Sequence, residues 1–301
     1  MSASAVLVNP ARVGNVLSLR RSIQKGLSEA GWPEPTWLQT TPTESGEELT
    51  RQAVRSGAKV VFVCGGDGTV MAAAAAVAGT DAALAVIPFG TGNVLALNLG
   101  LPTDVAGGVR AATRGGRRTI DLGEVEGRIF VVATGMGLDA QMLAETSHRG
   151  KHRFGWVAYA AAALRHLADP TFSAEVSLDG GPSIRRDVRS VLVANVGRLP
   201  GGINLLPLAS ADDGLLHVAL IAPRRLRDWA MLLASLVGRQ PRGGRLETYP
   251  VRRVEVTASH PQPREIDGDP FRPGVKLVVR VRPSALLVCV PLALATPPRP
   301  R

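Results

Sequence analysis

A glycine-rich turn with one carboxylate is the stretch whose residue types point most directly to chemistry. Residues 65–69 read GGDGT and follow the apolar run 60–64, which is typical of a strand buried on both faces. Glycines leave main-chain N–H groups open to a ligand, and the helix beginning near Thr69 points its positive end at the same place. Asp67 adds a carboxylate suited to hold a cation or a hydroxyl beside an anion. The turn therefore predicts a phosphate site, with a purely structural junction as the alternative.

Three more polar loops follow predicted strands. Asn9-Pro10 ends the strand 5–8, Thr40 and Thr41 end the strand 35–41, and PFGTGN at 88–93 follows the strand 84–87. The strands alternate with helical patterns at 16–30, 44–56 and 70–78, which predicts a doubly wound parallel sheet. Such sheets bind ligands at the carboxyl ends of their strands, so the four loops should meet on one rim.

The pattern changes near Thr119, and short β-like runs take over. They cover 128–133, 174–178, 188–196, 215–221, 253–258, 276–281 and 286–290, with apolar helical patterns at 156–167 and 226–237. This predicts a mainly antiparallel β-sandwich as a second domain. The expected organisation is an α/β nucleotide-binding domain at 1–122, a β-rich substrate domain at 123–295 and a disordered tail at 296–301.

The charge of the chain favours an anionic partner. The 301 residues carry a formal net charge of +10, and only four of the 35 basic residues are lysines, at positions 25, 59, 151 and 276. This balance suits nucleotide phosphates, an anionic membrane surface or nucleic acid. The sequence offers no nucleic-acid recognition motif, and an aromatic content of 4% leaves few stacking platforms, so nucleic acid is disfavoured.

The cysteines and apolar runs bear on the compartment. Cys64 and Cys289 both lie in apolar strand-like runs, which indicates a reducing compartment rather than a disulfide framework or a zinc site. The first residues lack a signal-like pattern, and no apolar run approaches the ~18 residues needed to span a bilayer. We expect a cytoplasmic protein that touches a membrane peripherally without crossing it.

The ordered set of motifs resembles the diacylglycerol kinase catalytic-domain family, specifically the soluble bacterial lipid kinases that are also similar to sphingosine and ceramide kinases. GGDGT alone is shared with NAD kinases, but the whole series is not. The series comprises VNP at 8–10, GGDGTV at 65–70, PFGTGN at 88–93, IDLG at 120–123, GMGLDA at 135–140, GWVAYAAAALRHL at 155–167, NVGRLPGGINLLPLASADDGLLHV at 195–218 and IDGD at 266–269.

The resemblance implies an ATP site on the N-terminal rim, with a magnesium ion held by Asp67 at the phosphates. The residues implied in nucleotide binding are Asn9, Pro10, Thr40, Thr41, Gly65, Gly66, Asp67, Gly68, Thr69, Gly90, Thr91 and Asn93. Backbone amides and hydroxyls suit this role because they bind phosphate without a competing charge. Two alternatives stay open: Asp67 as a helix cap, and Asn9 as an Asx-turn before proline.

The resemblance also implies a second, structural magnesium loop at SADDGL. Asp213 would be the carboxylate ligand, and Ser210 and Leu215 would contribute backbone carbonyls. One carboxylate with carbonyls and waters suits a hard cation held for shape. A plain Asp-Gly hairpin turn is the alternative.

The reacting carboxylates are implied at EIDGD. Asp267 matches the family's general base, which accepts the proton of the lipid hydroxyl during phosphoryl transfer. Asp269 stands where the family usually has glutamate, so its catalytic role is less defined. An Asp-Gly turn between strands is again the structural alternative.

Two further positions and one basic run qualify this picture. Val94 stands where many family members have aspartate, which weakens the case for diacylglycerol as the particular lipid. Asp121 in IDLG would supply a polar group at the interdomain cleft, or serve the structure alone. A basic run at 148–153 would attract anionic headgroups, with a solvated loop as the equal alternative.

The sequence thus predicts an ATP- and magnesium-dependent lipid kinase that acts from the cytoplasmic face of the membrane. Its acceptor would be diacylglycerol or a similar lipid, its product phosphatidic acid or an analogous phospholipid, and a homodimer is plausible from the family. The alternatives are an NAD kinase and a catalytically silent lipid-binding or regulatory protein on the same scaffold.

Overall fold

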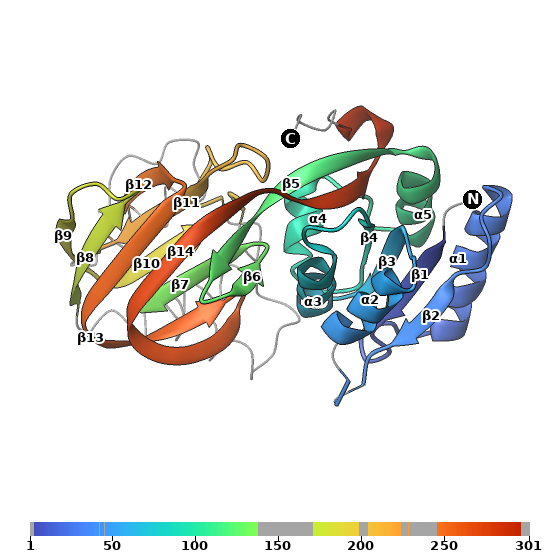
Figure 1. The fold of residues 1–301 in the computed structure, drawn as a ribbon, viewed down its shortest axis with the longest axis horizontal. Coiled ribbons are helices and arrows are strands. Elements are labelled where there is room, and N and C mark those ends of the chain that lie inside the picture. Colours follow the sequence, from blue (N-terminus) through green and yellow to red (C-terminus); the bar gives the residue numbers. More distant parts are fainter. Residues whose placement is uncertain are drawn as a thin grey trace. The chain divides into compact units, whose positions relative to one another are not determined.

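The computed structural model describes residues 3–137 without 42 and 45, residues 171–198, 204–223, 228 and 231, and residues 246–295 (Figure 1). The chain divides into two compact units, one of Met1–Asp121 with Pro283–Arg301 and one of Leu122–Arg282. The predicted boundary after residue 122 lies one residue from this division. The expected second domain, however, does not keep its C-terminal part: the end of β14 (Asp269–Val290) pairs with β4 (Ala83–Pro88) and so joins the first unit. The predicted tail 296–301 lies outside the described residues.

The first unit is built on a parallel sheet, as predicted. Its strands are β1 (Ser4–Val8), β2 (Thr36–Gln39), β3 (Val60–Gly65) and β4, in the order β14-β4-β3-β1-β2 with every pairing parallel. Strands β1, β3 and β4 are buried along their whole length, which explains their unbroken apolar sequences.

Helices cover both faces of this sheet. The helices are α1 (Val16–Glu29), α2 (Gly46–Arg55), α3 (Asp67–Val77), α4 (Val94–Leu99) and α5 (Val105–Arg114). Val6 and Val8 of β1 pack in one core with α1 and α5, whereas the intervening Ala5 packs with Ala53 of α2. This alternation follows from the two-residue period of a strand. Cys64 and Cys289 are both buried and free, as predicted.

The second unit is an antiparallel β structure. Its strands are β5 (Gly116–Val125), which begins in the first unit, β6 (Arg128–Phe130), β7 (Ala133–Gly137), β8 (Phe172–Leu178), β9 (Ile184–Val188), β10 (Ser190–Ala194), β11 (Leu216–Ile221), β12 (Leu246–Val251), β13 (Arg253–Ile266) and β14. The order is β12-β11-β10-β7-β13-β14, with β8 pairing β13, and β9 pairing β8. The predicted helical pattern 156–167 and most of 226–237 lie outside the described residues.

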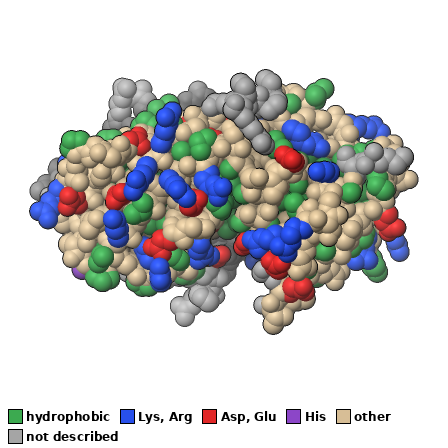
Figure 2. Space-filling model, in the orientation of Figure 1, with side chains coloured by type: hydrophobic (Ala, Val, Ile, Leu, Met, Phe, Trp, Pro, Cys, Tyr) green, Lys and Arg blue, Asp and Glu red, His purple; other side chains and the backbone are tan. Residues whose placement is uncertain are grey.

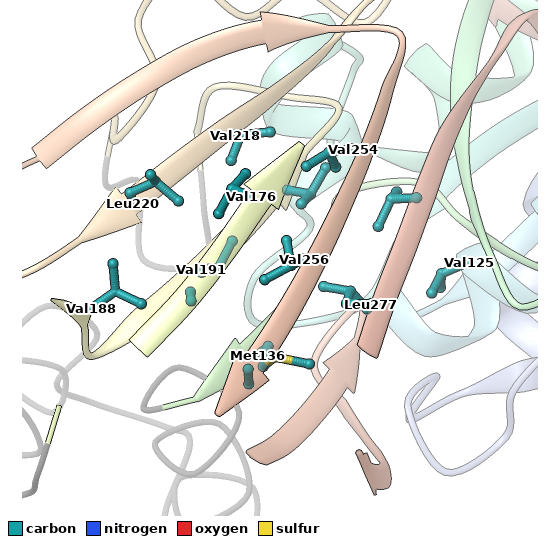
Figure 3. Packing of buried hydrophobic residues seen from close by; sticks show 14 of the residues in the cluster. Val125, Met136, Val176, Val188, Val191, Val218, Leu220, Val254, Val256 and Leu277 are labelled. Atoms are coloured by element: carbon teal, nitrogen blue, oxygen red, sulfur yellow. The ribbon is translucent and has the colours of Figure 1, made fainter. Parts of the chain in front are cut away.

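Alternating valines and leucines form the core of this sandwich. Val254 and Val256 of β13 and Leu277 of β14 are fully buried, and Figure 3 shows them pointing toward Val176 of β8 and Val191 of β10. Because alternate residues of each strand face this core, their neighbours form an outer face that carries the charged side chains.

Strand β14 is longer than the sequence predicted. The runs 276–281 and 286–290 belong to one 22-residue strand, and Pro283-Ser284 does not end it. Ser284 has a φ of 52°, and its N–H donates to Asp121 Oδ1 at 2.7 Å, which holds the backbone through this irregular point. No helix in the described ranges is long and apolar enough to cross a membrane.

Candidate active site

The loops after β1 and β3 meet where the strand order of the parallel sheet reverses. β1 pairs with β2 on one side and β3 on the other, and Asn9 N–H donates to the Cys64 carbonyl at 3.0 Å. Asn9 Nδ2 also donates to Thr69 Oγ1 at 3.2 Å, so the first loop is fastened to the start of α3. A reversal of this kind is where doubly wound sheets bind ligands. Asn9 Oδ1 accepts Ala11 N–H at 3.1 Å as well, so the Asx-turn alternative is also realised.

The glycines of this edge keep backbone close to backbone. Gly66 is the N-cap of α3 and provides no side chain there, and a Cβ on Gly68 would have no atom within 4 Å. A Cβ on Gly90 would lie 2.9 Å from Gly66 Cα, so the two glycine loops are in contact through their main chains. Thr69 and Val70 N–H donate to the Gly66 carbonyl at 3.0 and 3.1 Å, so the N–H groups of Asp67 and Gly68 are the ones left at the positive end of α3. This edge of the sheet can therefore accept an anion.

Asp67 joins these two loops through its carboxylate. Oδ1 accepts Val94 N–H at 2.7 Å and Oδ2 accepts Asn93 N–H at 3.0 Å, so the side chain caps α4. The helix-cap alternative is therefore realised, at α4 rather than α3. Each carboxylate oxygen has two acceptor positions, and these bonds fill one on each. Asp67 can thus serve as a cap and still offer oxygen to a cation.

Arg12 is a site residue to which the sequence reasoning gave no role. It is exposed, and its Nε lies 3.9 Å from the position a Cβ on Gly66 would take. Its backbone N–H donates to the Asn9 carbonyl at 3.0 Å, which places it in the loop that Asn9 fastens. A basic residue two positions after Asn-Pro at a strand end was the signal that could have found it.

The other predicted nucleotide residues line the same edge. Thr40 follows β2, and its N–H donates to the Val8 carbonyl at 3.0 Å. Thr41 Oγ1 accepts Glu44 N–H at 2.9 Å, which turns the chain toward α2. Asn93 Oδ1 accepts Gly90 N–H at 2.9 Å, and Thr91 is exposed between them. The structure thus brings together at one rim the four loops that the sequence placed there.

In the second unit, Asp267 occupies a two-residue turn between β13 and β14. Asp267 and Gly268 have φ values of 52° and 86°, and Ile266 pairs with Asp269 across the turn. Positive φ at both central residues is the type I′ geometry that favours Asp-Gly. The hairpin-turn alternative is therefore realised for the backbone.

The Asp267 carboxylate binds three successive main-chain amides. Oδ1 accepts Val132 N–H at 2.8 Å and Ala133 N–H at 3.0 Å, and Oδ2 accepts Val131 N–H at 2.8 Å. Two oxygens offer about four acceptor positions, so one position on Oδ2 remains for a further donor. The residue as a whole is half-buried.

The environment of Asp267 suits proton transfer. Burial raises the pKa of this carboxyl to about 6, the three amide hydrogen bonds act in the opposite direction, and the charge of Asp269 raises it further. A base is most effective when its pKa lies near the working pH.

Hydrogen bonds of Glu265 stabilise the hairpin that carries Asp267. Glu265 is buried, its Oε2 accepts Gly268 N–H at 2.7 Å, and its carbonyl accepts Thr134 Oγ1 at 2.6 Å. Asp269 is exposed directly after the turn. Sequence reasoning assigned no role to Glu265, because a positioning contact within a turn leaves no distinct motif.

In the predicted second metal loop, the Asp213 carboxylate is engaged in hydrogen bonds with nearby protein groups. Asp213 Oδ1 accepts Leu215 N–H at 2.9 Å, and Oδ2 is 3.3 Å from Ser210 N and 3.1 Å from Nε2 of the buried His217. The Ser210 carbonyl is 3.4 Å from Asp213 N. Within the described ranges no group of three or more His, Cys, Asp or Glu residues is arranged to hold a metal. Asp213 keeps one acceptor position, so the structural ion stays a prediction.

Asp121 is a buried anchor in the first unit, where it accepts the Ser284 N–H. This bond holds β14 at Ser284, its residue of positive φ. The observed contact therefore agrees with the alternative in which Asp121 serves the structure alone.

Comparison with solved structures supports the fold. A diacylglycerol kinase from Bacillus anthracis str. Sterne superposes with a TM-score of 0.80 at 20% identity, covering 97% of this chain and 98% of that chain. An NAD kinase from Archaeoglobus fulgidus, solved in complex with ATP, superposes with a TM-score of 0.54 at 13% identity, covering 95% and 93%. The fold is therefore that of the diacylglycerol kinases and NAD kinases, with an N-terminal α/β domain and a C-terminal β-sandwich.

Comparison of sequences shows the family. The model of the diacylglycerol kinase catalytic domain matches residues 4–125, and that of the YegS C-terminal NAD kinase beta sandwich-like domain matches residues 131–290. A relative from Pseudomonas syringae pv. tomato named "Probable lipid kinase YegS-like" is 32% identical over 87% of this chain and 85% of its own length. One of the same name from Pseudomonas aeruginosa is 33% identical over 83% and 84%. The chain belongs to the diacylglycerol kinase catalytic-domain family, among the YegS-like lipid kinases.

Proposed function

We propose that this lipid kinase transfers the γ-phosphoryl group of ATP to a hydroxyl of diacylglycerol or a similar lipid, giving phosphatidic acid or an analogous phospholipid. The observation that carries the proposal is the Asp267 carboxylate, which three amides hold in place while one acceptor position on Oδ2 stays open. Family membership supplies the reaction class, and this geometry supplies the group that takes the proton.

ATP binds at the rim of the first unit. Its phosphates lie at the start of α3, where Gly66 and Gly68 leave the backbone bare and the helix end is positive. Arg12 beside Gly66 supplies a cation to the same phosphates. Asn9 and Thr69 hold the two loops together, so the phosphate cradle is formed before ATP arrives.

Magnesium fits Asp67, the carboxylate of this rim. Mg²⁺ binds through one or two carboxylates together with substrate phosphates, and each oxygen of Asp67 keeps one acceptor position. When bound, the ion offsets negative charge on the phosphates. Asp67 keeps its cap on α4 throughout, so the two glycine loops stay in register.

Asp267 acts as the general base. The hydroxyl of the lipid donates to the open position on Oδ2, its oxygen bonds to the γ-phosphorus as the bond to ADP breaks, and the proton passes to Asp267. A pKa of about 6 leaves Asp267 mostly ionised near neutral pH and therefore able to accept that proton. Asp269, exposed beside the turn, helps to hold the acceptor hydroxyl.

The reaction places the protein at a membrane surface, because its acceptor is a lipid. We propose peripheral attachment to the cytoplasmic face, which the net charge of +10 favours through anionic headgroups. A homodimer stays a prediction that light scattering of the purified protein would test.

The rival reaction is phosphorylation of NAD. The fold likeness to NAD kinases keeps it open, while the relatives named as lipid kinases and the higher TM-score to a diacylglycerol kinase favour a lipid. The other rival is a silent lipid-binding protein, which the departures at Val94 and Asp269 suggest.

Radiolabelled ATP with magnesium and a total bacterial lipid extract tests the proposal. We expect label in one lipid class, no label in NAD added in a parallel reaction, and loss of the lipid signal in Asp267→Asn. Label in NAD would support the first rival. Equal background for wild type and Asp267→Asn, with both proteins folded by circular dichroism, would support the silent protein.

A further inference from the structure

Three arginines surround the ring of Phe271 in the second unit. The guanidinium carbons of Arg264, Arg128 and Arg272 lie 4.6, 5.4 and 5.8 Å from the ring centroid. They come from three different strand regions, β13, β6 and β14. Together with Glu126 these residues form what we call the Phe271 arginine cluster.

Arg264 is the fixed base of this cluster. It is buried, and it donates to the carbonyls of Arg272 and Lys276, each at 2.8 Å, and to Glu126 Oε1 at 2.6 Å. The register of β13 against β14 shifts on either side of Gln262, and Arg264 binds carbonyls beside this irregularity. A Cβ on Gly274 would lie 3.0 Å from the Arg264 guanidinium, so glycine there makes room for it. Arg264 therefore has a structural role, which is to stabilise the β13–β14 hairpin.

The other two arginines are available to a ligand. Both are exposed, the Arg272 side chain to 75%, and Arg128 has no carboxylate partner in the parts of the chain that the structure describes. Glu126 is the one carboxylate of the cluster, shared by Arg272 and Arg264, which lower its pKa in that order and keep it ionised. Three guanidiniums against one carboxylate leave two positive charges.

Four other cations of this unit have carboxylate partners close by. Figure 2 shows basic and acidic side chains interspersed on the visible face, and the ion pairs agree: Arg253 and Lys276 share Glu255, while Arg280 and Arg282 share Glu124. The Phe271 arginine cluster differs from these four in that exposed Arg128 lies over an aromatic ring and has no such partner among the described residues.

The cluster lies close to Asp267. Phe271 pairs with Arg264 across the hairpin, two residues beyond the Ile266–Asp269 pair that closes the turn. Two steps along a strand are roughly 7 Å. Arg128 is three residues before Val131, whose N–H binds the Asp267 carboxylate. Both exposed guanidiniums therefore lie within reach of a group that binds at the Asp267 turn.

We propose that Arg128 and Arg272 form a binding site for a phosphate group beside Asp267. A guanidinium presents paired N–H donors that match phosphate oxygens, and the Phe271 ring holds these donors in place. The existence of this site is argued from the arginines and Phe271 alone. Only its role in the reaction rests on the proposed kinase function. The phosphate belongs either to the nucleotide or to the phosphorylated lipid, and the experiment separates the two.

The double variant Arg128→Gln/Arg272→Gln tests this site, with Arg253→Gln/Lys276→Gln as the matched control that removes two cations from the same unit. Binding of inorganic pyrophosphate is measured by calorimetry without any substrate. Kinetic assays in neutral detergent micelles then give the KM for ATP, the KM for diacylglycerol and the inhibition constant of phosphatidic acid.

We expect the first double variant to weaken pyrophosphate binding about tenfold and the control to stay within about twofold of wild type. A tenfold rise in the KM for ATP assigns the site to the nucleotide, whereas a tenfold rise in the inhibition constant of phosphatidic acid assigns it to the lipid phosphate. The KM for diacylglycerol, which has no phosphate, should not move.

Equal pyrophosphate affinity in the two double variants would overturn the proposal, even if the wild type is an active kinase. If the wild type transfers no phosphate to lipid, the proposed function fails, and the pyrophosphate measurement still decides on the site. Thermal unfolding of each variant shows whether the sandwich is intact.

Discussion

Asp67 and Asp267 lie in different units, yet both use their carboxylates in the same way. Each accepts main-chain N–H groups from a segment far along the chain, 26 to 27 residues away for Asp67 and 134 to 136 for Asp267. Asp67 binds two amides and caps a short helix, whereas Asp267 binds three and sits in a type I′ turn. Sequence reasoning treated each structural role as an alternative to chemistry.

The two sites differ in how many acceptor positions remain open on the carboxylate oxygens. Asp67 keeps one acceptor position on each oxygen, which suits a cation that bridges to phosphate. Asp267 keeps a single position, on Oδ2, and burial raises its pKa to about 6, which suits one proton. In the proposed function, these open positions would let Asp67 hold a metal ion and Asp267 accept a proton.

The largest expected effect is that of Asp267→Asn. The amide cannot accept a proton, and its NH₂ group would face the Val131 N–H, so phosphoryl transfer should fall about 10²- to 10⁴-fold. Steady-state transfer to diacylglycerol measures this loss.

Asp179 provides the matched control for that variant. It also lies in an Asp-Gly turn of positive φ, and its Oδ1 accepts the N–H groups of Arg252 and Arg253 at 2.8 and 2.7 Å. Asp179→Asn should keep activity within about twofold. Similar losses in both variants would mean that a damaged turn, rather than a missing base, explains the effect.

Stability should respond to pH through Asp267. A carboxyl whose pKa is raised on folding binds its proton more tightly in the native state, so its contribution to stability declines as pH rises from about 4 to 6. Between pH 4.5 and 7 the wild type should lose about 2 kcal/mol relative to Asp267→Asn. Urea unfolding of both proteins at the two pH values measures this, and a change of opposite sign would show that the amide bonds outweigh burial.

Gly68→Ala tests where the phosphates of ATP bind in the first unit. A Cβ there meets no protein atom within 4 Å, and alanine should raise helix stability by about 0.5 kcal/mol. If ATP phosphates occupy that space, binding of ATP should weaken about tenfold. Calorimetry gives the affinity and thermal unfolding gives the stability; unchanged affinity would place the nucleotide elsewhere.

The smallest effect concerns the cap on α4. Asp67→Ala removes the acceptor of the Asn93 and Val94 N–H groups and should cost about 1 kcal/mol of unfolding free energy. Asp104→Ala, which removes the N-cap of α5 at Gly107, is a comparison outside the site and should cost a similar amount. Only Asp67→Ala should also raise the magnesium concentration needed for half-maximal activity; equal magnesium dependence in the two variants would count against Asp67 as a ligand.

Local pattern predicted much of the fold. The apolar runs and glycine stops located α1, β3 and the four loops of the rim, because burial and turn chemistry act over a few residues. Helices α4 and α5 were missed: α4 spans six residues, and α5 contains Gly107 and Gly108, which disfavour helix. Strand β14 was divided at Pro283, because its continuation depends on pairing with β4.

The candidate site was predicted through its motifs and not through its contacts. GGDGT and IDGD named Asp67 and Asp267, but nothing local shows that Asp267 binds residues 131–133, since that contact spans more than 130 positions. Arg12 and the Asp213–His217 hydrogen bond were missed because their importance lies in a neighbour brought close by folding.

The pH dependence of kcat/KM for phosphoryl transfer to diacylglycerol tests whether Asp267 is the base, because it reports the ionisation of the essential base in the free enzyme. We expect a profile that is level above pH 7 and falls about tenfold per unit below pH 6, following the ionisation of Asp267. A profile that stays level down to pH 4.5 in a protein that remains folded would contradict the assignment of Asp267 as the base.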